Sequence, residues 1–342
     1  MKYSEEWVLL IRVAMLSFWH VHAKDYAKQA TEHPDTEIVA VWDEIPERGR
    51  KEAEQRGVKF YESLDELLKQ DDIDAVIVDA PTNMHREVMV KAAQAGKHIF
   101  TEKVLAPTLK ECNDILAAVE QAGVKLVVSL PRLNDRYTLA IQDVIEQGLL
   151  GRLTLARVRL SHAGAVAGWL PEHFFNLEQC AGGALIDLGC HPMYLTRLFL
   201  GLPESVTASY GYVTGKQVED NAVSVLQYAD GAIGVVEAGF VNRCSPFSIE
   251  IHGTDGSLLY GLPDSKLLLR TTKRGEEAAK QWSEVALPDN RPSAFRQWVS
   301  HIQNNTTADE NIRLAVDLTR LMEASNLSAR EKRSVRLDEL AG

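Results

Sequence analysis

The segment GGALIDLGCHPMY (182–194) combines a carboxylate and an imidazole at a spacing suited to acid–base chemistry. Asp187 and His191 are four residues apart, so a helix would place both side chains on one face. A carboxylate that fixes the tautomer of an imidazole is a recurrent general-base arrangement. The same spacing also fits a surface pair or a buried histidine with satisfied hydrogen bonds. The preceding Gly182 and Gly183 allow another backbone or a ligand to approach closely.

A second candidate lies in FTEKVLAPT (100–108), where Glu102 and Lys103 follow an apolar run. The carboxyl ends of parallel strands form the ligand-binding edge of a doubly wound sheet, and Lys103 would lie there. The alternative is a solvated surface lysine.

Two other segments also end at this edge. In DAPTNMH (79–85) Ala80, Pro81 and Thr82 lead into a helix whose first N–H groups can bind an anion, and His85 either faces that groove or packs below it. Asp43 ends the run 37–43, where an acid can accept hydrogen bonds from an adenosine ribose and disfavour a 2′-phosphate. The alternatives are a turn aspartate, and a nearby Arg48 that meets a 2′-phosphate.

The remaining candidates are weaker. His20 and His22 are two residues apart, but no carboxylate or cysteine completes a recognised metal spacing with them or with His85, so we expect no metal. An aromatic loop and a crossover segment are candidates for substrate contact or for plain core and hinge positions. Their residues are Trp169, His173, Arg132 and Asn134, and Tyr194 is a further candidate for substrate contact.

The elements that must position these residues change character along the chain. Apolar runs at 8–16, 37–43, 58–61, 73–80, 97–103 and 125–130 alternate with helical patterns at 22–33, 46–57, 63–70, 83–96 and 108–123. Strands that alternate with helices predict a doubly wound parallel α/β sheet. Its first strand begins at Trp7 or, more conservatively, at Ile11; residues 1–6 fit no element.

A different pattern follows residue 130. Alternating segments at 151–164, 205–215, 221–241 and 247–261 carry hairpin turns, and helical patterns occupy 182–201, 293–304 and 309–331. We therefore expect two domains, 1–130 and 131–342. The second is an α+β domain with a mostly antiparallel sheet, helices on one side and a free face that supports a homo-oligomer.

Composition narrows the class of protein. The 342 residues have a net charge of -11, which disfavours nucleic acid or an anionic membrane as a partner. No apolar run approaches the ~20 residues of a membrane span. The four cysteines, Cys112, Cys180, Cys190 and Cys244, show no CxxC spacing and indicate reduced thiols in a cytoplasm.

The order of DAPTNMH, AGKHIFTEKVLAPT, GGALIDLGCH, ADGAIGVVEAGF and IEIHGTDGSL resembles the glucose–fructose oxidoreductase / inositol dehydrogenase / MocA family from about residue 11 to 337. The resemblance implies a Rossmann domain, an open-faced second sheet, a nicotinamide cofactor and a sugar or polyol substrate. It also implies that Lys103 binds cofactor and substrate and that Asp187 and His191 are the acid and base.

The chain departs from the family at three places. Val104 stands for the proline of the EKP motif, and Tyr194 stands where an aspartate is common. The largest departure is the turn LSFWHVHA (16–23), which has no glycine of the G-x-G-x-x-G pattern. We expect a shorter turn in which Ser17, Phe18, His20 or His22 and the helix N-terminus still meet the dinucleotide, NAD rather than NADP. The alternative is that the cofactor site is lost.

Three functions fit these residues. In the leading hypothesis His191 takes a hydroxyl proton, Asp187 orients it, Lys103 stabilises the oxygen, and hydride passes to the nicotinamide. In the second, the nicotinamide acts transiently during cleavage of a glycosidic bond. In the third, the chain is a non-catalytic sensor on the same fold, which the absent glycines and Tyr194 favour.

Overall fold

The structure is a computed structural model that describes residues 10–340, so the alternative strand start at Trp7 lies outside the described residues. It divides into two compact units. The first contains residues up to 106, 111–129 and 292–312, and the second contains 107–110, 130–291 and 313 onwards. The expected boundary at residue 130 separates the two sheets. Residues 292–312, which were expected in the second domain, belong to the first unit.

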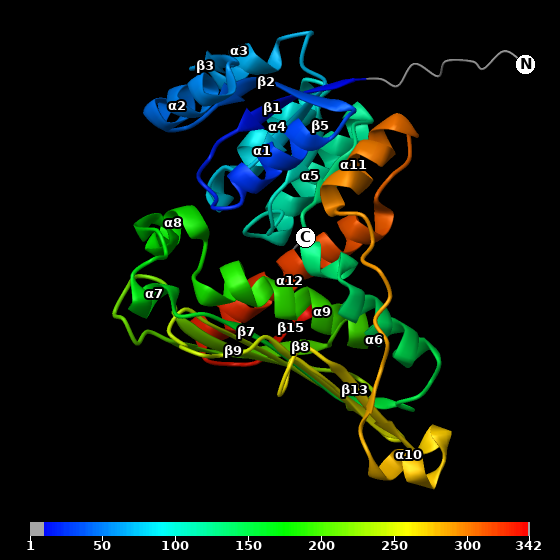
Figure 1. The fold of residues 1–342 in the computed structure, drawn as a ribbon. Coiled ribbons are helices and arrows are strands. Elements are labelled where there is room, and N and C mark those ends of the chain that lie inside the picture. The colour runs from blue at the N-terminus through cyan, green and yellow to red at the C-terminus, as the bar shows by residue number, and fades with distance from the viewer. Residues whose placement is uncertain (1–9, 341–342) are drawn as a thin grey trace, which may run out of the picture. The chain divides into compact units, whose positions relative to one another are not determined.

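The first unit is built on a six-stranded parallel sheet in the order β3-β2-β1-β4-β5-β6 (Figure 1). This order confirms the predicted doubly wound fold, since the chain runs outward from β1 in both directions. The strands are β1 (Ile11–Leu16), β2 (Thr36–Trp42), β3 (Lys59–Tyr61), β4 (Ala75–Val78), β5 (His98–Thr101) and β6 (Leu126–Val128). The helices are α1 (Ala23–Glu32), α2 (Pro46–Arg56), α3 (Leu64–Leu68), α4 (His85–Gln94), α5 (Leu109–Ala122) and α11 (Ala294–Gln303).

Aromatic packing explains why α11 belongs to the first unit. The rings of Phe295 and Trp298 lie 5.6 and 5.7 Å from that of Phe100 on β5, and all three side chains are buried. Aromatic pairs at this separation stabilise a core beyond the area that they bury. The helix was predicted, but no local signal shows which sheet it covers.

The second unit contains a nine-stranded sheet in the order β14-β13-β12-β11-β7-β10-β9-β8-β15. Among the strands that the structure describes in this sheet, only the β7–β10 pair is parallel, so the predicted mostly antiparallel sheet is confirmed. The strands are β7 (Leu153–Ser161), β8 (Ser205–Gly211), β9 (Asn221–Gln227), β10 (Ile233–Gly239), β11 (Ser248–Gly253), β12 (Gly256–Tyr260), β13 (Leu267–Thr271), β14 (Ser283–Glu284) and β15 (Val335–Arg336).

Helices α9 (Cys190–Leu200) and α12 (Asp309–Glu331) lie over one face of this sheet (Figure 1). A π-helix, η4 (Leu185–Gly189), runs directly into α9. The other helices are α6 (Arg136–Glu146), α7 (Gly164–Ala167), α8 (Leu177–Cys180) and α10 (Glu276–Lys280). None of the helices within residues 10–340 combines the length and apolar character of a membrane span.

Candidate active site

The backbone N–H groups of the glycine-free turn after β1 form hydrogen bonds within the protein. Ser17 has a φ of 78°, a left-handed conformation that glycine usually supplies. The N–H of Phe18 donates to Asp43 at 2.9 Å, that of Trp19 to the Ser17 hydroxyl at 3.0 Å, and that of His20 to the Asp79 carbonyl at 3.2 Å. These N–H groups are therefore engaged within the protein.

This geometry corrects two of the expected cofactor contacts. Phe18 is buried in the core of the first unit, with the Arg56 guanidinium 4.7 Å from its ring centre. Ser17 is fully buried, and its hydroxyl also accepts from Arg48 at 3.3 Å. Neither the Phe18 ring nor the Ser17 hydroxyl is therefore presented at the sheet edge to a dinucleotide.

The acid expected to meet the ribose is also enclosed. Both carboxylate oxygens of Asp43 accept hydrogen bonds, from the N–H groups of Phe18 and Ile45 and from Arg48 at 2.8 Å. Its neighbour Glu44, which sequence reasoning missed, also accepts from Arg48 at 2.6 Å. The other oxygen of Glu44, Oε2, is buried and has no hydrogen-bond partner among the described residues.

The turn after β4 carries the other predicted cofactor residues. Ala80, Pro81 and Thr82 lie buried at the start of a short 3-10 helix, η1 (Thr82–Met84). His85 packs below the edge instead of facing a groove: Nδ1 lies 2.9 Å from the Val104 carbonyl and Nε2 lies 3.1 Å from that of Ala80. Burial lowers the pKa of His85, so the neutral ring is favoured.

Several polar side chains lie around Glu102, the residue that follows β5. One oxygen, Oε1, lies 3.4 Å from Nδ1 of His22 and 3.8 Å from the Lys103 ammonium. The other, Oε2, accepts a short hydrogen bond from Tyr26, whose hydroxyl also lies 2.7 Å from that of Ser129. Burial opposes ionisation of Glu102, but the charges of His20, His22 and Lys103 outweigh it and hold its pKa below the ordinary range.

In the second unit, His191 is held by a tyrosine. Nδ1 of His191 lies 3.0 Å from the Tyr194 hydroxyl, which also accepts the backbone N–H of Arg132 at 3.1 Å. Tyr194 is fully buried, so the expected contact between Tyr194 and substrate is corrected to a contact with the imidazole. The Arg132 side chain turns to Tyr137 at 3.1 Å and to the face of Phe247, while its Nε has no hydrogen-bond partner among the described residues.

Asp187 and the aromatic loop surround a further histidine. Asp187 lies on η4, and its charge favours protonation of His162, although burial is the larger effect and lowers the His162 pKa. The His162 ring lies 4.5 Å from Trp169, which is 58% exposed. His173 lies in the following 3-10 helix, η3 (Glu172–Phe175). His162 was missed because nothing near it in sequence carries a signal.

Glu219 fixes the start of η4. It accepts the N–H groups of Gly183 and Leu185 at 2.9 and 3.0 Å. A Cβ on Gly183 would lie 2.1 Å from the Glu219 carbonyl oxygen, which confirms the predicted close approach of another backbone to the glycine pair. Burial is the main cause that raises the pKa of Glu219 to about 7.

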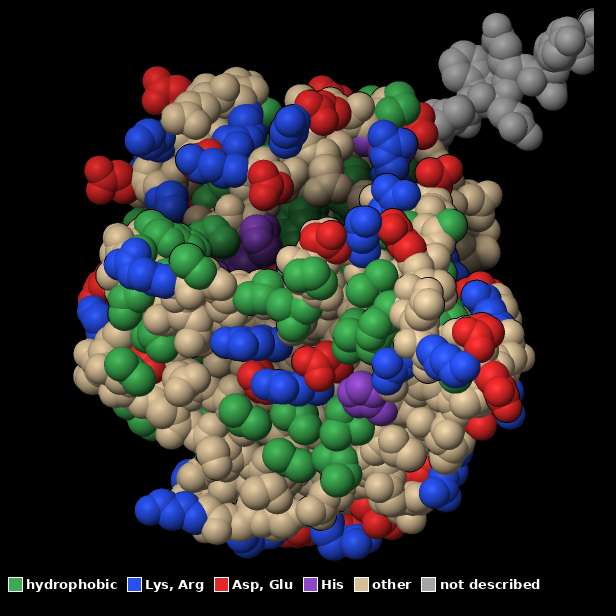
Figure 2. All heavy atoms as spheres, turned by 60° about the horizontal axis from the view of Figure 1, so that its bottom comes forward, with side chains coloured by type: hydrophobic (Ala, Val, Ile, Leu, Met, Phe, Trp, Pro, Cys, Tyr) green, Lys and Arg blue, Asp and Glu red, His purple; other side chains and the backbone are tan. Residues whose placement is uncertain are grey.

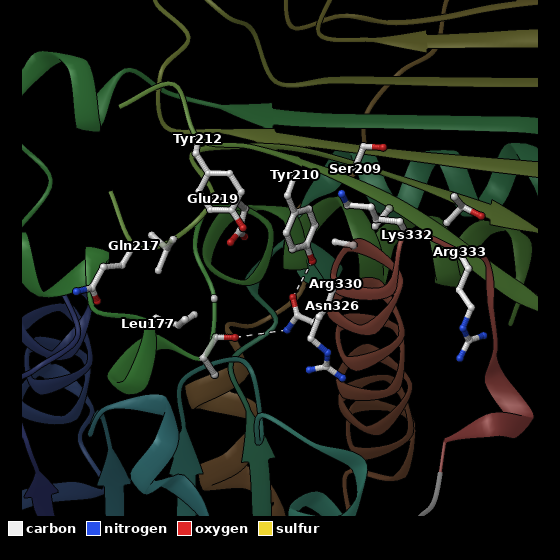
Figure 3. A pocket seen from close by; sticks show the side chains of 16 residues that line it. Leu177, Ser209, Tyr210, Tyr212, Gln217, Glu219, Asn326, Arg330, Lys332 and Arg333 are labelled. Atoms are coloured by element: carbon white, nitrogen blue, oxygen red, sulfur yellow. Dashed lines mark hydrogen bonds between the residues drawn. The ribbon is translucent and has the colours of Figure 1, made fainter. Parts of the chain in front are cut away.

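Glu219 also lines a cavity of about 770 Å³ (Figure 3). Tyr210, Tyr212 and Asn326 lie around it, and the Tyr210 hydroxyl donates to Asn326 at 2.7 Å. None of the predicted catalytic residues lines this cavity, so it is separate from the His191 site.

Comparison with known proteins identifies the class to which these features belong. Residues 11–130 match the oxidoreductase family with an NAD-binding Rossmann fold, and residues 138–259 match the GFO/IDH/MocA C-terminal domain. The chain therefore belongs to the Gfo/Idh/MocA family of oxidoreductases, as the sequence motifs predicted.

Individual relatives act on sugars and polyols. The chain is 32% identical over 245 residues to 1,5-anhydro-D-fructose reductase of Ensifer adhaerens, covering 69% of this chain and 72% of the relative. It is 26% identical over 327 residues to myo-inositol 2-dehydrogenase of Thermotoga maritima, covering 90% and 93%. The fold matches a levoglucosan dehydrogenase solved with NADH and levoglucosan, with a TM-score of 0.80, 20% identity and coverage of 96% and 99%. The chain is thus an oxidoreductase of a nicotinamide-binding family whose named relatives are dehydrogenases and reductases.

Proposed function

We propose that this protein oxidises a secondary alcohol of a sugar or polyol, or reduces the corresponding ketone, with NAD(H). The observation that carries the proposal is the buried His191, held at Nδ1 by Tyr194 in a chain of this family. Its relatives named for anhydrofructose and inositol support the substrate class. When bound, the nicotinamide supplies the hydride chemistry.

The residues at the edge of the first sheet fit a dinucleotide, with the ribose contact moved by one residue. Oε2 of Glu44, which has no hydrogen-bond partner within residues 10–340, is assigned the acceptor role that we had expected of Asp43. Asp43 and Glu44 carry two negative charges around the single guanidinium of Arg48, which leaves this position negative. A negative site favours a ribose hydroxyl over a 2′-phosphate, hence NAD over NADP.

Two residues carry the proton and charge chemistry. When the Nδ1 proton of His191 is donated to Tyr194, Nε2 is the nitrogen that takes the hydroxyl proton of the alcohol. Lys103, buried beside Glu102, is assigned to stabilise the negative charge that develops on the reacting oxygen. Asp187 favours protonation of His162 through its charge.

The exposed face of the second sheet supports self-association. Val223 and Ile233 are 37% and 42% exposed, and Leu155, Val225 and Val235 share their face of the sheet, since each lies opposite or beside them in register. Figure 2 shows hydrophobic side chains on this surface among basic and acidic ones. We infer that the protein is a homo-oligomer through this face and, because its four cysteines form no disulfide with one another, that it works in a reducing cytoplasm.

A screen of sugars and polyols with NAD⁺, followed by the absorbance of the reduced nicotinamide, tests the activity. Stoichiometric reduction by one substrate class supports the proposal. Bond cleavage without net reduction would replace it with the transient-redox reaction, and binding without any turnover would replace it with a sensor.

A further inference from the structure

Two histidines and a carboxylate from distant parts of the first unit meet at the edge of its sheet. His20 and His22 belong to the turn before α1, while Glu102 follows β5 eighty residues later. One ligand atom from each lies within 4.8 Å of the other two. The expectation of no metal rested on the lack of a nearby carboxylate in the sequence, and the fold supplies one.

We propose that His20, His22 and Glu102 form a binding site for a divalent transition-metal ion, with zinc as the ion of reference. Two imidazoles and one carboxylate are a ligand set of catalytic zinc sites and of other borderline divalent ions. Three protein ligands leave a coordination position open to water or to an oxygen of a bound ligand, so the site is not a closed structural one.

The spacing of the ligands suits one ion after a small contraction. Metal–nitrogen and metal–oxygen bonds are about 2.0–2.2 Å, so two atoms on the same ion lie about 3–4 Å apart. Nδ1 of His22 and Oε1 of Glu102 are already 3.4 Å apart. The rings of His20 and His22 have centroids 4.8 Å apart. The His22 side chain is 41% exposed, which provides both freedom to rotate and a path of entry for the ion.

The surroundings orient the ligands as metal sites require. Tyr26 donates to Oε2 of Glu102, so Oε1 is the oxygen that faces His22. Hydrogen bonds of this kind to a ligating carboxylate fix its orientation. Nδ1 of His20 accepts the backbone N–H of His22 at 3.2 Å, so we assign Nε2 of His20 to the ion. Coordination displaces the proton from that nitrogen, and metal binding therefore releases protons.

A second buried acid, Asp79, lies at the same place. Asp79 is fully buried, and neither of its carboxyl oxygens has a hydrogen-bond partner among residues 10–340. It lies beside the other groups: its backbone carbonyl accepts the N–H of His20 at 3.2 Å, and its carboxyl is close enough to Glu102 for their charges to interact. A second buried carboxyl beside Glu102 can supply a further negative charge when a cation is bound.

Metal binding is measured on the full chain stripped with a chelator, without nucleotide or substrate, so the outcome does not depend on the oxidoreductase proposal. Calorimetric titration with Zn²⁺ is expected to show one equivalent with micromolar or tighter affinity, and Co²⁺ is expected to give visible absorption bands that Zn²⁺ abolishes. His22→Ala and Glu102→Gln should each weaken binding by more than about 100-fold, since even outer-shell partners are worth about 10–100-fold.

His301→Ala is the matched control, because His301 belongs to α11 of the same unit and bonds to Thr306 outside the cluster. It should bind zinc as the parent chain does. His22 is half-exposed, so its variant keeps the fold, which a melting curve verifies. Absence of binding by the stripped parent, or binding that survives in His22→Ala and Glu102→Gln, would overturn the proposal.

Discussion

Nδ1 of His191 lies 3.0 Å from the hydroxyl oxygen of Tyr194, and that hydroxyl is anchored in turn by the backbone N–H of Arg132 at 3.1 Å. The resemblance to the family led us to expect an aspartate at the position of Tyr194. Here a fully buried tyrosine orients the imidazole. Tyr194 is therefore a positioning residue, and its hydroxyl links the crossover segment to the proposed base.

Tyr194→Phe removes this hydrogen bond and keeps the ring. A hydrogen bond is worth about 0.5–1.5 kcal/mol, so we expect kcat to fall by about two- to tenfold while the KM for NAD⁺ stays unchanged. The pH profile of kcat should also shift, because the imidazole loses its partner. Tyr228→Phe, whose hydroxyl donates to the Gly201 carbonyl, is the control. Equal profiles for parent and Tyr194→Phe would show that the hydroxyl is only structural.

His191→Ala is expected to lower turnover by about 10²–10⁴-fold, the range of general-base assistance. Affinity for NADH should be retained, since the residues assigned to the dinucleotide belong to the first unit. Steady-state rates together with nicotinamide fluorescence separate the two effects. Full turnover of this variant on a confirmed substrate would exclude His191 as the base.

Glu44→Gln tests the ribose contact. Replacing the carboxylate weakens a charged acceptor and reduces the negative charge around Arg48, so we expect the preference for NADH over NADPH to narrow by about tenfold. Glu47→Gln, an exposed position in the first turn of α2, should leave it unchanged. The dissociation constants of NADH and NADPH measure this preference. An unchanged ratio of the two constants in Glu44→Gln would indicate that Asp43, not Glu44, makes the ribose contact.

Glu219 links stability to pH. Its pKa rises from 4.5 to about 7, chiefly through burial, with the N–H groups of Gly183 and Leu185 opposing and Asp220 adding to the rise. A carboxyl with a raised pKa binds its proton more tightly in the folded state. The stabilisation is therefore complete below pH 4.5 and is lost as pH rises through about 7, by at most about 3 kcal/mol.

Glu219→Gln should remove this slope, since an amide does not titrate. The free energy of unfolding of the parent and the variant, measured by denaturant titration between those two pH values, checks it. Parallel curves would show that Glu219 titrates normally.

Ile233→Glu tests the oligomer. The side chain is 42% exposed on β10 and lies opposite Leu155 and Gln227, so a charge there is compatible with the folded chain but not with a buried interface. We expect a lower mass by light scattering. Val213→Glu, 70% exposed in the loop after β8, should keep the parent mass. A parent chain that is already monomeric would contradict the inference.

Much of the first unit followed from local pattern. Its buried parallel strands are continuous apolar runs, and stops such as Gly57, with a φ of 67°, bound the helices. In the second unit the pattern was less complete. α6 was missed although Tyr137, Ile141 and Val144 recur at helical spacing, whereas strands β13 to β15 were missed because they are short. The π-helix at Leu185–Gly189 leaves no signature in residue spacing.

The candidate site was harder to predict because its contacts span long separations. Motifs located Lys103 and His191. They did not show that Glu102 lies beside His22, which is 80 residues away in the sequence, or that Tyr194 contacts His191 where a substrate contact was expected. Phe18 shows the limit most clearly. An aromatic residue in a turn can point outward or inward, and only the packed core decides that it lies under Arg56.

The most direct test of the central claim is titration of the purified protein with NAD(H) and NADP(H), read by calorimetry or nicotinamide fluorescence. The account predicts that NADH binds with micromolar affinity and more tightly than NADPH, although the turn after β1 has no glycine. Absence of binding to either dinucleotide at millimolar concentration would contradict this prediction. It would indicate that the turn after β1, whose N–H groups bond within the protein, no longer binds a dinucleotide.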